Sequence, residues 1–459
     1  MKASSTPQLS QPDPVSFWEA FRFWLKLGFV SFGGPAGQIA IMHQELVEKR
    51  RWLSEQRFLH ALNYCMLLPG PEAQQLAIYI GWLMHRSWGG IIAGGLFVLP
   101  SLLLLIGLSW IYLAYGNVPA IAGVLYGIKP AVTAIVVFAA YRIGSRALKN
   151  AWLWSMAALA FLAIFLLDTP FPLIVLVAAI CGGIGGKYAP QKFVVGGGHG
   201  TNKQSFGSAL IDDNTPTPPH ALFTWAGLIK VILAGLSLWG GAIGYLCARY
   251  GWDGGLTQMG WFFTKAALLT FGGAYAVLPY VYQGAVEHFH WLTPHQMIDG
   301  LALGETTPGP LIMVVTFVGF VAGWTKELFG SDQLFLAGAA AATVVTYFTF
   351  LPSFLFILAG GPLVESTHGN LKYTAPLTGI TAAVVGVILN LAVFFAWHVF
   401  WPLGFTGRFD GISALISFCA LLALTRYKIG VIPVIASCGA TGFLLTFIKA
   451  WLAQKGIML

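Results

Sequence analysis

The chain has 459 residues, of which 57% are hydrophobic and only 9% are charged, and its formal net charge is +8. That composition leaves too little polar surface for a soluble globule of this length, so it excludes a soluble enzyme and predicts a polytopic membrane protein. In such a protein the excess of Lys and Arg belongs to cytoplasmic loops, and no nucleic-acid partner is expected. Five cysteines lie scattered without metal-ligand spacing, so neither a metal site nor a cofactor is expected.

Apolar segments of the length needed to cross a bilayer follow one another along the chain. A polar tail, residues 1–16, precedes a first membrane repeat, 17–186, and the change to Gly, Lys, Ser, Thr and Pro at 187–220 predicts a flexible linker. An extra apolar helix at 221–250 then leads to a second membrane repeat, 256–453. The expected segments are 17–45, 55–85, 88–115, 118–141, 151–167 and 171–186, and then 256–287, 293–323, 334–359, 377–400, 411–424 and 430–453. The sequence predicts an all-α protein with about thirteen transmembrane segments.

Glycine and proline motifs interrupt two apolar segments in each half, and they recur at one offset. Phe32-Gly33-Gly34-Pro35 returns as Phe271-Gly272-Gly273, and Pro69-Gly70-Pro71 returns as Pro308-Gly309-Pro310, in both cases 239 residues later. The chain therefore contains an internal duplication. The interruptions predict helices that are discontinuous or re-entrant within the membrane.

The extra helix at 221–250 determines the relation between the two repeats. If the first repeat crosses the membrane an even number of times, one additional crossing makes the second repeat enter from the opposite side, as in transporters with inverted repeats. The distribution of Lys and Arg predicts a cytoplasmic N-terminus, although the charged loop at 45–57 does not fit unless the first two segments are re-entrant. Both arrangements of those segments stay open.

The breaks have a chemical consequence, because a helix that restarts inside an apolar segment presents free N–H groups and a partial positive charge. Lysines at equivalent positions, six residues before each Phe-Gly-Gly, add full charges. Four helix starts and two lysines suit a small, compact oxyanion. The candidate binding residues are Lys26, Phe32, Gly33, Gly34, Pro35, Gln38, Pro69, Gly70, Pro71, Gln74, Lys265, Phe271, Gly272, Gly273, Tyr275, Thr306, Thr307, Pro308, Gly309 and Pro310.

Alternative interpretations accompany each of these residues. A Gly-Gly pair in a membrane helix is often a packing contact, and a lysine near a helix end can extend to the membrane surface. Glu72 and Glu305 are candidates for proton coupling or for helix-end capping, and they also keep open a cation transporter or channel. A polytopic membrane enzyme is less favoured, since the histidines form no catalytic or metal-binding cluster.

Three stretches of the first half resemble the chromate ion transporter family in its long, two-domain form. They are Phe32-Gly33-Gly34-Pro35, Arg51-Trp52-Leu53 and the run from Leu68 to Ala77, and the second half is similar through Thr270-Phe271-Gly272-Gly273, Trp291-Leu292 and Thr306-Thr307-Pro308-Gly309-Pro310. The resemblance implies export of chromate, with sulfate as its structural mimic, across a bacterial inner membrane at the expense of the proton gradient. A homodimer is the candidate assembly.

Overall fold

The computed structural model describes residues 12–32, 34–116, 118–193, 207–271, 273–367, 374–404 and 406–454. Within these residues the chain forms sixteen α-helices and no named strand, so the predicted all-α class is confirmed. The helices are α1 (Phe17–Val30), α2 (Gly34–His43), α3 (Glu55–Cys65), α4 (Glu72–Tyr115), α5 (Pro119–Ala147), α6 (Ala151–Leu167), α7 (Phe171–Tyr188), α8 (Trp225–Tyr250), α9 (Gly255–Leu268), α10 (Ala274–Tyr282), α11 (Pro294–Thr306), α12 (Val314–Thr325), α13 (Leu334–Thr367), α14 (Thr374–Phe400), α15 (Gly411–Thr425) and α16 (Val431–Gln454).

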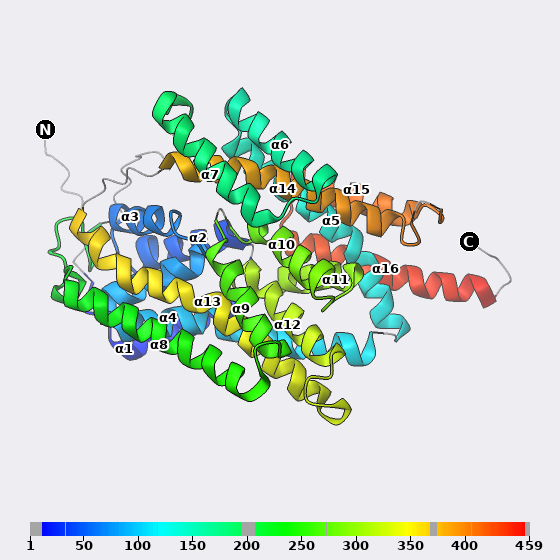
Figure 1. Cartoon of the computed structure of the whole chain (residues 1–459), viewed down its shortest axis with the longest axis horizontal. Coiled ribbons are helices and arrows are strands. Elements are labelled where there is room, and N and C mark those ends of the chain that lie inside the picture. Colours follow the sequence, from blue (N-terminus) through cyan, green and yellow to red (C-terminus); the bar gives the residue numbers. More distant parts are fainter. Residues whose placement is uncertain are drawn as a thin grey trace, which may run out of the picture.

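Seven helical stretches of the described chain are long and apolar enough to cross a membrane, namely α4, α5, α7, α8, α13, α14 and α16. Three shorter apolar stretches, α6, α15 and the one formed by α12 with the turn before it, accompany them. Helices α8, α13, α14 and α16 run roughly along the long axis of the molecule, with α8 on one outer edge and α6 and α7 on the opposite edge (Figure 1). This arrangement establishes a multi-pass membrane protein.

The first expected segment of each repeat is broken in two. Residues 17–45 form α1 and α2, with Ser31 and Phe32 as non-helical residues between them, and residues 256–287 form α9 and α10 in the same way. A helix of the length of α1 extends about 21 Å, which is less than the ~30 Å apolar thickness of a bilayer. Each of these helices ends inside the apolar layer and a second one begins there.

The second and third expected segments meet inside α4, which is a helical hairpin rather than one rod. Its backbone leaves the helical region at His85 and Arg86, where φ of Arg86 is 57°. The two arms lie so close that a Cβ atom at Gly81 would be 2.5 Å from the carbonyl oxygen of Gly89. The equivalent hairpin of the second repeat is formed by α12 and α13, which also pack against each other.

The charged turn after the first segment has the same backbone in both halves. Arg51 has φ of 53° and its equivalent His290 has φ of 50°. The next residue, Trp52, donates its N–H to the Leu46 carbonyl at 2.7 Å, and Trp291 donates to the Ala285 carbonyl at 2.7 Å. The sequence repeat is therefore a structural repeat.

The two repeats interlock through their last helices. In α5, a Cβ atom at Gly127 would lie 2.0 Å from the Cys438 carbonyl oxygen of α16, and in α14 a Cβ atom at Gly379 would lie 2.4 Å from the Ala178 carbonyl oxygen of α7. Gly379 follows Gly127 by 252 residues, so these are equivalent contacts. Each repeat thus packs its last helix against a helix of the other repeat.

The described part of the predicted flexible linker packs against the first repeat. Ile211 forms an isolated parallel bridge with Leu53, and Arg57 donates to the carbonyl of Thr215 at 2.7 Å. Ala221 is fully buried and α8 begins only at Trp225, because the Thr224 side chain caps it. Residues 194–206 of the predicted linker lie outside the described residues.

Candidate functional site

The four chain breaks meet in two pairs, and each pair joins the two repeats. The N–H of Gly309 donates to the Ser31 carbonyl at 2.7 Å, and the N–H of Gly70 donates to the Thr270 carbonyl at 2.7 Å. Since these residues are equivalent in the duplication, the two hydrogen bonds are the same contact made twice. The first break of one repeat is held against the second break of the other.

Glycine is required at both donor positions. φ is +126° at Gly70 and +96° at Gly309, a region that residues with a Cβ atom rarely occupy. A Cβ atom at Gly309 would lie 2.0 Å from Ser101 Oγ, and one at Gly70 would lie 2.5 Å from Ser353 Oγ. The Ser101 hydroxyl donates to the Pro308 carbonyl, so it fixes this break directly.

The other two breaks leave space free. Gly34 and Gly273 also have positive φ, +68° and +99°, but a Cβ atom at either would meet nothing within 4 Å. These residues stand at the starts of α2 and α10, where free N–H groups point out of the helix. Their predicted neighbours Gly33 and Gly272 lie outside the described residues.

The last proline of each Pro-Gly-Pro motif stands directly before a new helical turn. Pro71 and Pro310 precede the first helical residue, with ψ of 106° and 137°. The Pro71 carbonyl accepts the N–H of Gln75 at 3.0 Å and the Pro310 carbonyl accepts the N–H of Met313 at 2.9 Å, so each proline begins the new helical turn as its N-cap. Pro35, by contrast, is the second residue of α2.

Buried polar atoms without partners surround the first repeat's breaks. Gln38 donates its amide to the carbonyls of Ser31, at 3.2 Å, and Gly309, while its own Oε1 has no donor among the described residues. The side chain of Gln74 is fully buried, and neither its nitrogen nor its oxygen has a partner within the described chain; the same holds for the Ser31 hydroxyl. Each such group costs about 1–3 kcal/mol when left unsatisfied, so this cluster is suited to a polar ligand or water.

The second repeat carries ionisable groups instead. The Tyr275 hydroxyl donates to Glu305, which is 9% exposed, and the charge of Arg142 on α5 acts on Tyr275. Ala36 and Met66 occupy the equivalent positions of the first repeat. Arg142 was not among the predicted site residues, because its position at the end of a predicted segment is typical of a cytoplasmic anchor.

Several predicted residues make only local contacts. The hydroxyls of Thr306 and Thr307 donate to carbonyls of their own helix, at 2.9 and 3.0 Å. Glu72 is the first residue of α4, where an acidic side chain stabilises a helix start, and it is half-buried. Phe32 and Phe271 are half-buried beside the breaks. The Pro69 carbonyl accepts from the Gln75 amide at 2.7 Å, and the Pro308 carbonyl accepts from Ser101 as described above.

The two predicted lysines lie at equivalent places, but on the outside. Lys26 on α1 and Lys265 on α9 are both exposed, and the Lys265 ammonium lies 5.7 Å from the Trp261 ring centre. Neither lysine belongs to the buried cluster around the breaks. Their role in binding stays a prediction.

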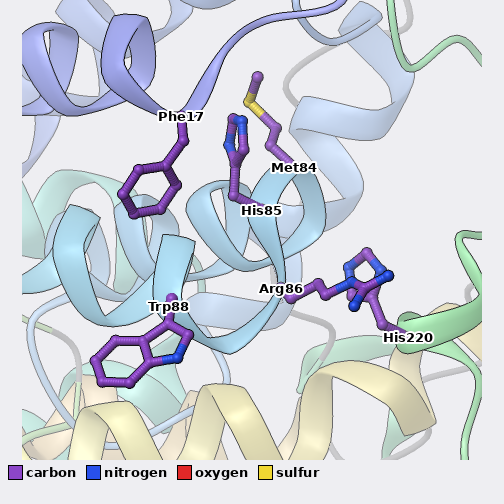
Figure 2. A pocket seen from close by; sticks show the side chains of 6 residues that line it. All are labelled: Phe17, Met84, His85, Arg86, Trp88 and His220. Carbon is purple, nitrogen blue, oxygen red and sulfur yellow. The ribbon is translucent and has the colours of Figure 1, made fainter.

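Two cavities lie away from the breaks. One of about 550 Å³ lies beside the turn of the α4 hairpin and has only cationic, aromatic and apolar side chains (Figure 2). The other, of about 310 Å³, lies at the far end of α4 and contains a carboxylate. The first is lined by Phe17, Met84, His85, Arg86, Trp88 and His220, and the second by Tyr112, Leu113, Gly116, Ala122, Leu125, Lys129, Gln296 and Asp299.

Comparison with known proteins identifies the family. The family model described as Chromate transporter matches residues 18–184 and 257–443, which are the two repeats seen in the structure. The chain belongs to the chromate transporter family. Members of this family are transporters, so the expectation that the chain is not an enzyme is confirmed, as is the resemblance found in the sequence.

The relatives match over most of their length. The chain is 32% identical to the chromate transport protein of Pseudomonas aeruginosa, over 97% of this chain and 96% of that protein. It is 29% identical to the chromate transport protein of Cupriavidus metallidurans, over 88% and 87%, and 29% identical to a probable chromate transport protein of Synechococcus elongatus, over 89% of each. No solved structure matches the chain.

Proposed function

We propose that this chromate transporter family member exports chromate, or a related oxyanion such as sulfate, across the bacterial inner membrane, driven by the proton gradient. The observation that carries the proposal is the cluster of buried, unpartnered polar atoms at the point where the repeats exchange backbone hydrogen bonds. The names of the relatives agree with chromate as substrate.

The chemistry of this cluster suits an oxyanion. The Gln74 amide and the Ser31 hydroxyl offer uncommitted hydrogen-bond donors, and Gly34 and Gly273 leave space at the positive ends of α2 and α10. A divalent tetrahedral oxyanion has four oxygens that accept hydrogen bonds in different directions. Donors contributed by several helix starts match that demand better than any one helix could.

We further propose that the two repeats are inverted in the membrane. The Glu19 carboxylate of α1 lies 3.5 Å from Arg50 in the charged loop, and Leu53 of that loop bridges Ile211 of the linker, which supports the re-entrant arrangement, in which each broken pair returns to the face it entered from. The second arm of α4 and helices α5, α6, α7, α8, α13, α14, α15 and α16 then make nine crossings rather than thirteen. Nine is odd, so the chain ends are expected on opposite sides. In Figure 1, α1–α3 lie toward one end of the long axis and α16 ends toward the other. The distribution of Lys and Arg favours a cytoplasmic N-terminus.

A cation transporter is the second candidate, and it has one observation in its favour. Glu305 is a buried carboxylate at the second break of the second repeat, and Tyr275 bonds it. A transported cation would bind that carboxylate, whereas a coupled proton would neutralise it. Both candidate functions use Glu305, but they differ in the ion that is transported: a cation in one case and an oxyanion in the other.

Everted membrane vesicles test the proposal. Vesicles containing the wild-type protein should accumulate labelled chromate when a pH gradient is imposed, unlabelled sulfate should compete if it shares the site, and labelled monovalent cations should not accumulate. Gln74→Leu should raise KM about tenfold or more, because a lost hydrogen bond to an ion is worth about 1.5–3 kcal/mol. Gln258→Leu, which removes an amide bonded to the Trp252 carbonyl far from the breaks, is the matched control. Normal chromate uptake by Gln74→Leu would assign the anion site elsewhere.

A further inference from the structure

Asp299 is a buried carboxylate that faces a cavity and is only half satisfied. It lies on α11, is 3% exposed, and lines the cavity of about 310 Å³. Its Oδ2 accepts from the Tyr112 hydroxyl at 2.9 Å and lies 3.4 Å from Lys129 Nζ, but its Oδ1 has no partner within the described chain. A carboxylate buried in a membrane protein normally has both oxygens bonded, so the free oxygen marks a place for something that binds and leaves.

The contacts of Asp299 join the two repeats. Lys129 belongs to α5 and Tyr112 to α4, both in the first repeat, while Asp299 belongs to the second. Glu305 lies six residues further along the same helix, directly before the second break. Whatever changes the charge of Asp299 therefore changes how α11 is held against α5, and α11 leads to the proposed anion site.

A second ion pair between the repeats shows what a purely structural pair looks like in this protein. Glu365 on α13 accepts from Arg57 Nη1 at 2.8 Å through one oxygen and from the Tyr79 hydroxyl through the other. Both of its oxygens are bonded, and Arg57 makes a further hydrogen bond to the Thr215 carbonyl. Neither Glu365 nor Arg57 lines either of the two cavities described above. Asp299 has the same kind of partners, a cation and a tyrosine, but with a free oxygen and a cavity.

We infer that Asp299 is a proton-binding site whose ion pair with Lys129 holds α11 of the second repeat against α5 of the first until a proton from the cavity breaks it. A hydronium ion gives a proton to Oδ1 and leaves as water, Asp299 becomes neutral, and Lys129 keeps its charge without a counter-ion. The attraction between the two helices then falls. This inference rests on the proposed proton-coupled export and assigns the coupling to a residue other than Glu72 and Glu305.

The surroundings of Asp299 favour a proton over a metal cation. Lys129 keeps a positive charge 3.4 Å away, which repels a metal ion but permits neutralisation of the carboxylate. His295, on α11 itself, has its ring centre 6.1 Å from that of His398 on α14. Tyr126, three residues before Lys129 on α5, donates its hydroxyl to Asp410, and Glu305 near the end of α11 accepts from Tyr275. No group of three or more His, Cys, Asp or Glu side chains suited to a metal ion occurs in the described part of the chain.

The cavity gives protons a route from one face. Gly116 and Ala122, at the turn between α4 and α5, line it together with Asp299. In the proposed topology this turn is on the periplasmic side, opposite to the cationic cavity beside His85 and Arg86. Protons that enter from the periplasm would reach Asp299 first, as an exporter driven by their return requires.

The first test separates coupling from substrate movement in liposomes that contain the full-length protein. A gradient of one pH unit can support about a tenfold chromate gradient per coupled proton. Wild type should accumulate chromate under this gradient, whereas Asp299→Asn should lose the accumulation and still exchange labelled for unlabelled chromate without a gradient. Asp299→Glu, which keeps an ionisable group, should retain accumulation with a shifted pH profile. Full gradient-driven accumulation by Asp299→Asn would overturn the inference.

Glu365→Gln is the matched control, because it neutralises the other buried carboxylate between the repeats. Gradient-driven accumulation and gradient-free exchange of chromate should both fall in this variant, each in proportion to the amount of folded protein. If Glu365→Gln separates the two activities as Asp299→Asn does, the effect is a general consequence of breaking a contact between repeats, and the assignment to Asp299 is wrong.

The second test needs no transported ion, so it remains decisive if wild type moves no oxyanion and the proposed function fails. Spin labels at Ala122→Cys and Gln296→Cys, in a background without native cysteines, report the separation of α5 and α11. The separation should increase as pH falls with Asp299 present and should stay large at every pH in Asp299→Asn. A separation that does not change with pH in the presence of Asp299 would overturn the inference.

Discussion

The contact between repeats at Gly309 allows a quantitative test of the fold. In Gly309→Ala the new Cβ atom must be accommodated at φ of +96°, which costs about 1–2 kcal/mol. The Cβ atom would also lie 2.0 Å from Ser101 Oγ, so the hydroxyl must turn away and its hydrogen bond to the Pro308 carbonyl is lost, for about 1 kcal/mol. If the hydrogen bond from the Gly309 N–H to the Ser31 carbonyl is also lost, the cost rises by another ~1 kcal/mol. The total loss in the free energy of unfolding is then about 3–4 kcal/mol.

Thermal unfolding of the purified protein in detergent measures this effect. Gly309→Ala should lower Tm by several degrees and reduce chromate uptake, while Gly95→Ala, on the same α4 that carries Ser101, should be neutral or slightly stabilising because its Cβ atom meets nothing within 4 Å. Adding Ser101→Gly to Gly309→Ala removes the clash but not the backbone cost, so only part of the loss should return. Equal Tm values for Gly309→Ala and Gly95→Ala would refute the argument.

Three further predictions concern the transport site and the topology. The proposal that Lys26 and Lys265 hold the anion predicts that each Lys→Gln variant loses uptake at normal protein levels; an unchanged kcat with a raised KM would instead assign these exposed lysines to attracting the ion. Glu48 and Glu287, equivalent in the repeat, should sit on opposite membrane faces, so cysteines placed there should differ in labelling from outside, and equal labelling would reject inversion. Gly34→Val should abolish uptake, because φ of +68° excludes a β-branched residue and its side chain would enter the open space before α2; normal uptake would show that this space is not used.

The duplication made much of the fold predictable. The offset between Gly70 and Gly309 equals the offset between the two Phe-Gly-Gly motifs, and this identified the paired breaks. The structure shows why both glycines are needed, because each has a positive φ and each donates its N–H to a carbonyl of the other repeat. The extent of most segments followed from apolar length alone. The split of the second and third segments also agrees with the structure, since the turn of the α4 hairpin lies at His85 and Arg86.

Other features could not be predicted from spacing. A polar, glycine-rich composition predicts a flexible linker, yet Ile211 and Thr215 lie in a docked stretch that bonds the α3 region. Arg142 and Lys129 read as helix-end and mid-helix charges in the sequence, because nothing in one helix shows which side chain of another it meets. Asp299 was not singled out for the same reason: its partners are 170 and 187 residues away.

The residues that recur in both repeats have a different role from the polar and ionisable residues that only the structure identifies. The preserved ones are backbone positions, such as Gly70 and Gly309, where any side chain would disturb the contact between repeats. The ionisable groups differ between the halves: Asp299 corresponds to His60 and Glu305 to Met66, whereas the buried amide of Gln74 corresponds to Met313. At the buried positions the first repeat supplies the neutral amide of Gln74 and the second supplies the carboxylates of Asp299 and Glu305, while His60 and Glu72 of the first repeat are half-buried. An anion can be held by the neutral amide without competing for the proton that the buried carboxylates bind, and coupling then requires a mechanical link between the halves. The hydrogen bond from Gly309 to Ser31 and the ion pair from Asp299 to Lys129 are such links, because each joins one repeat to the other.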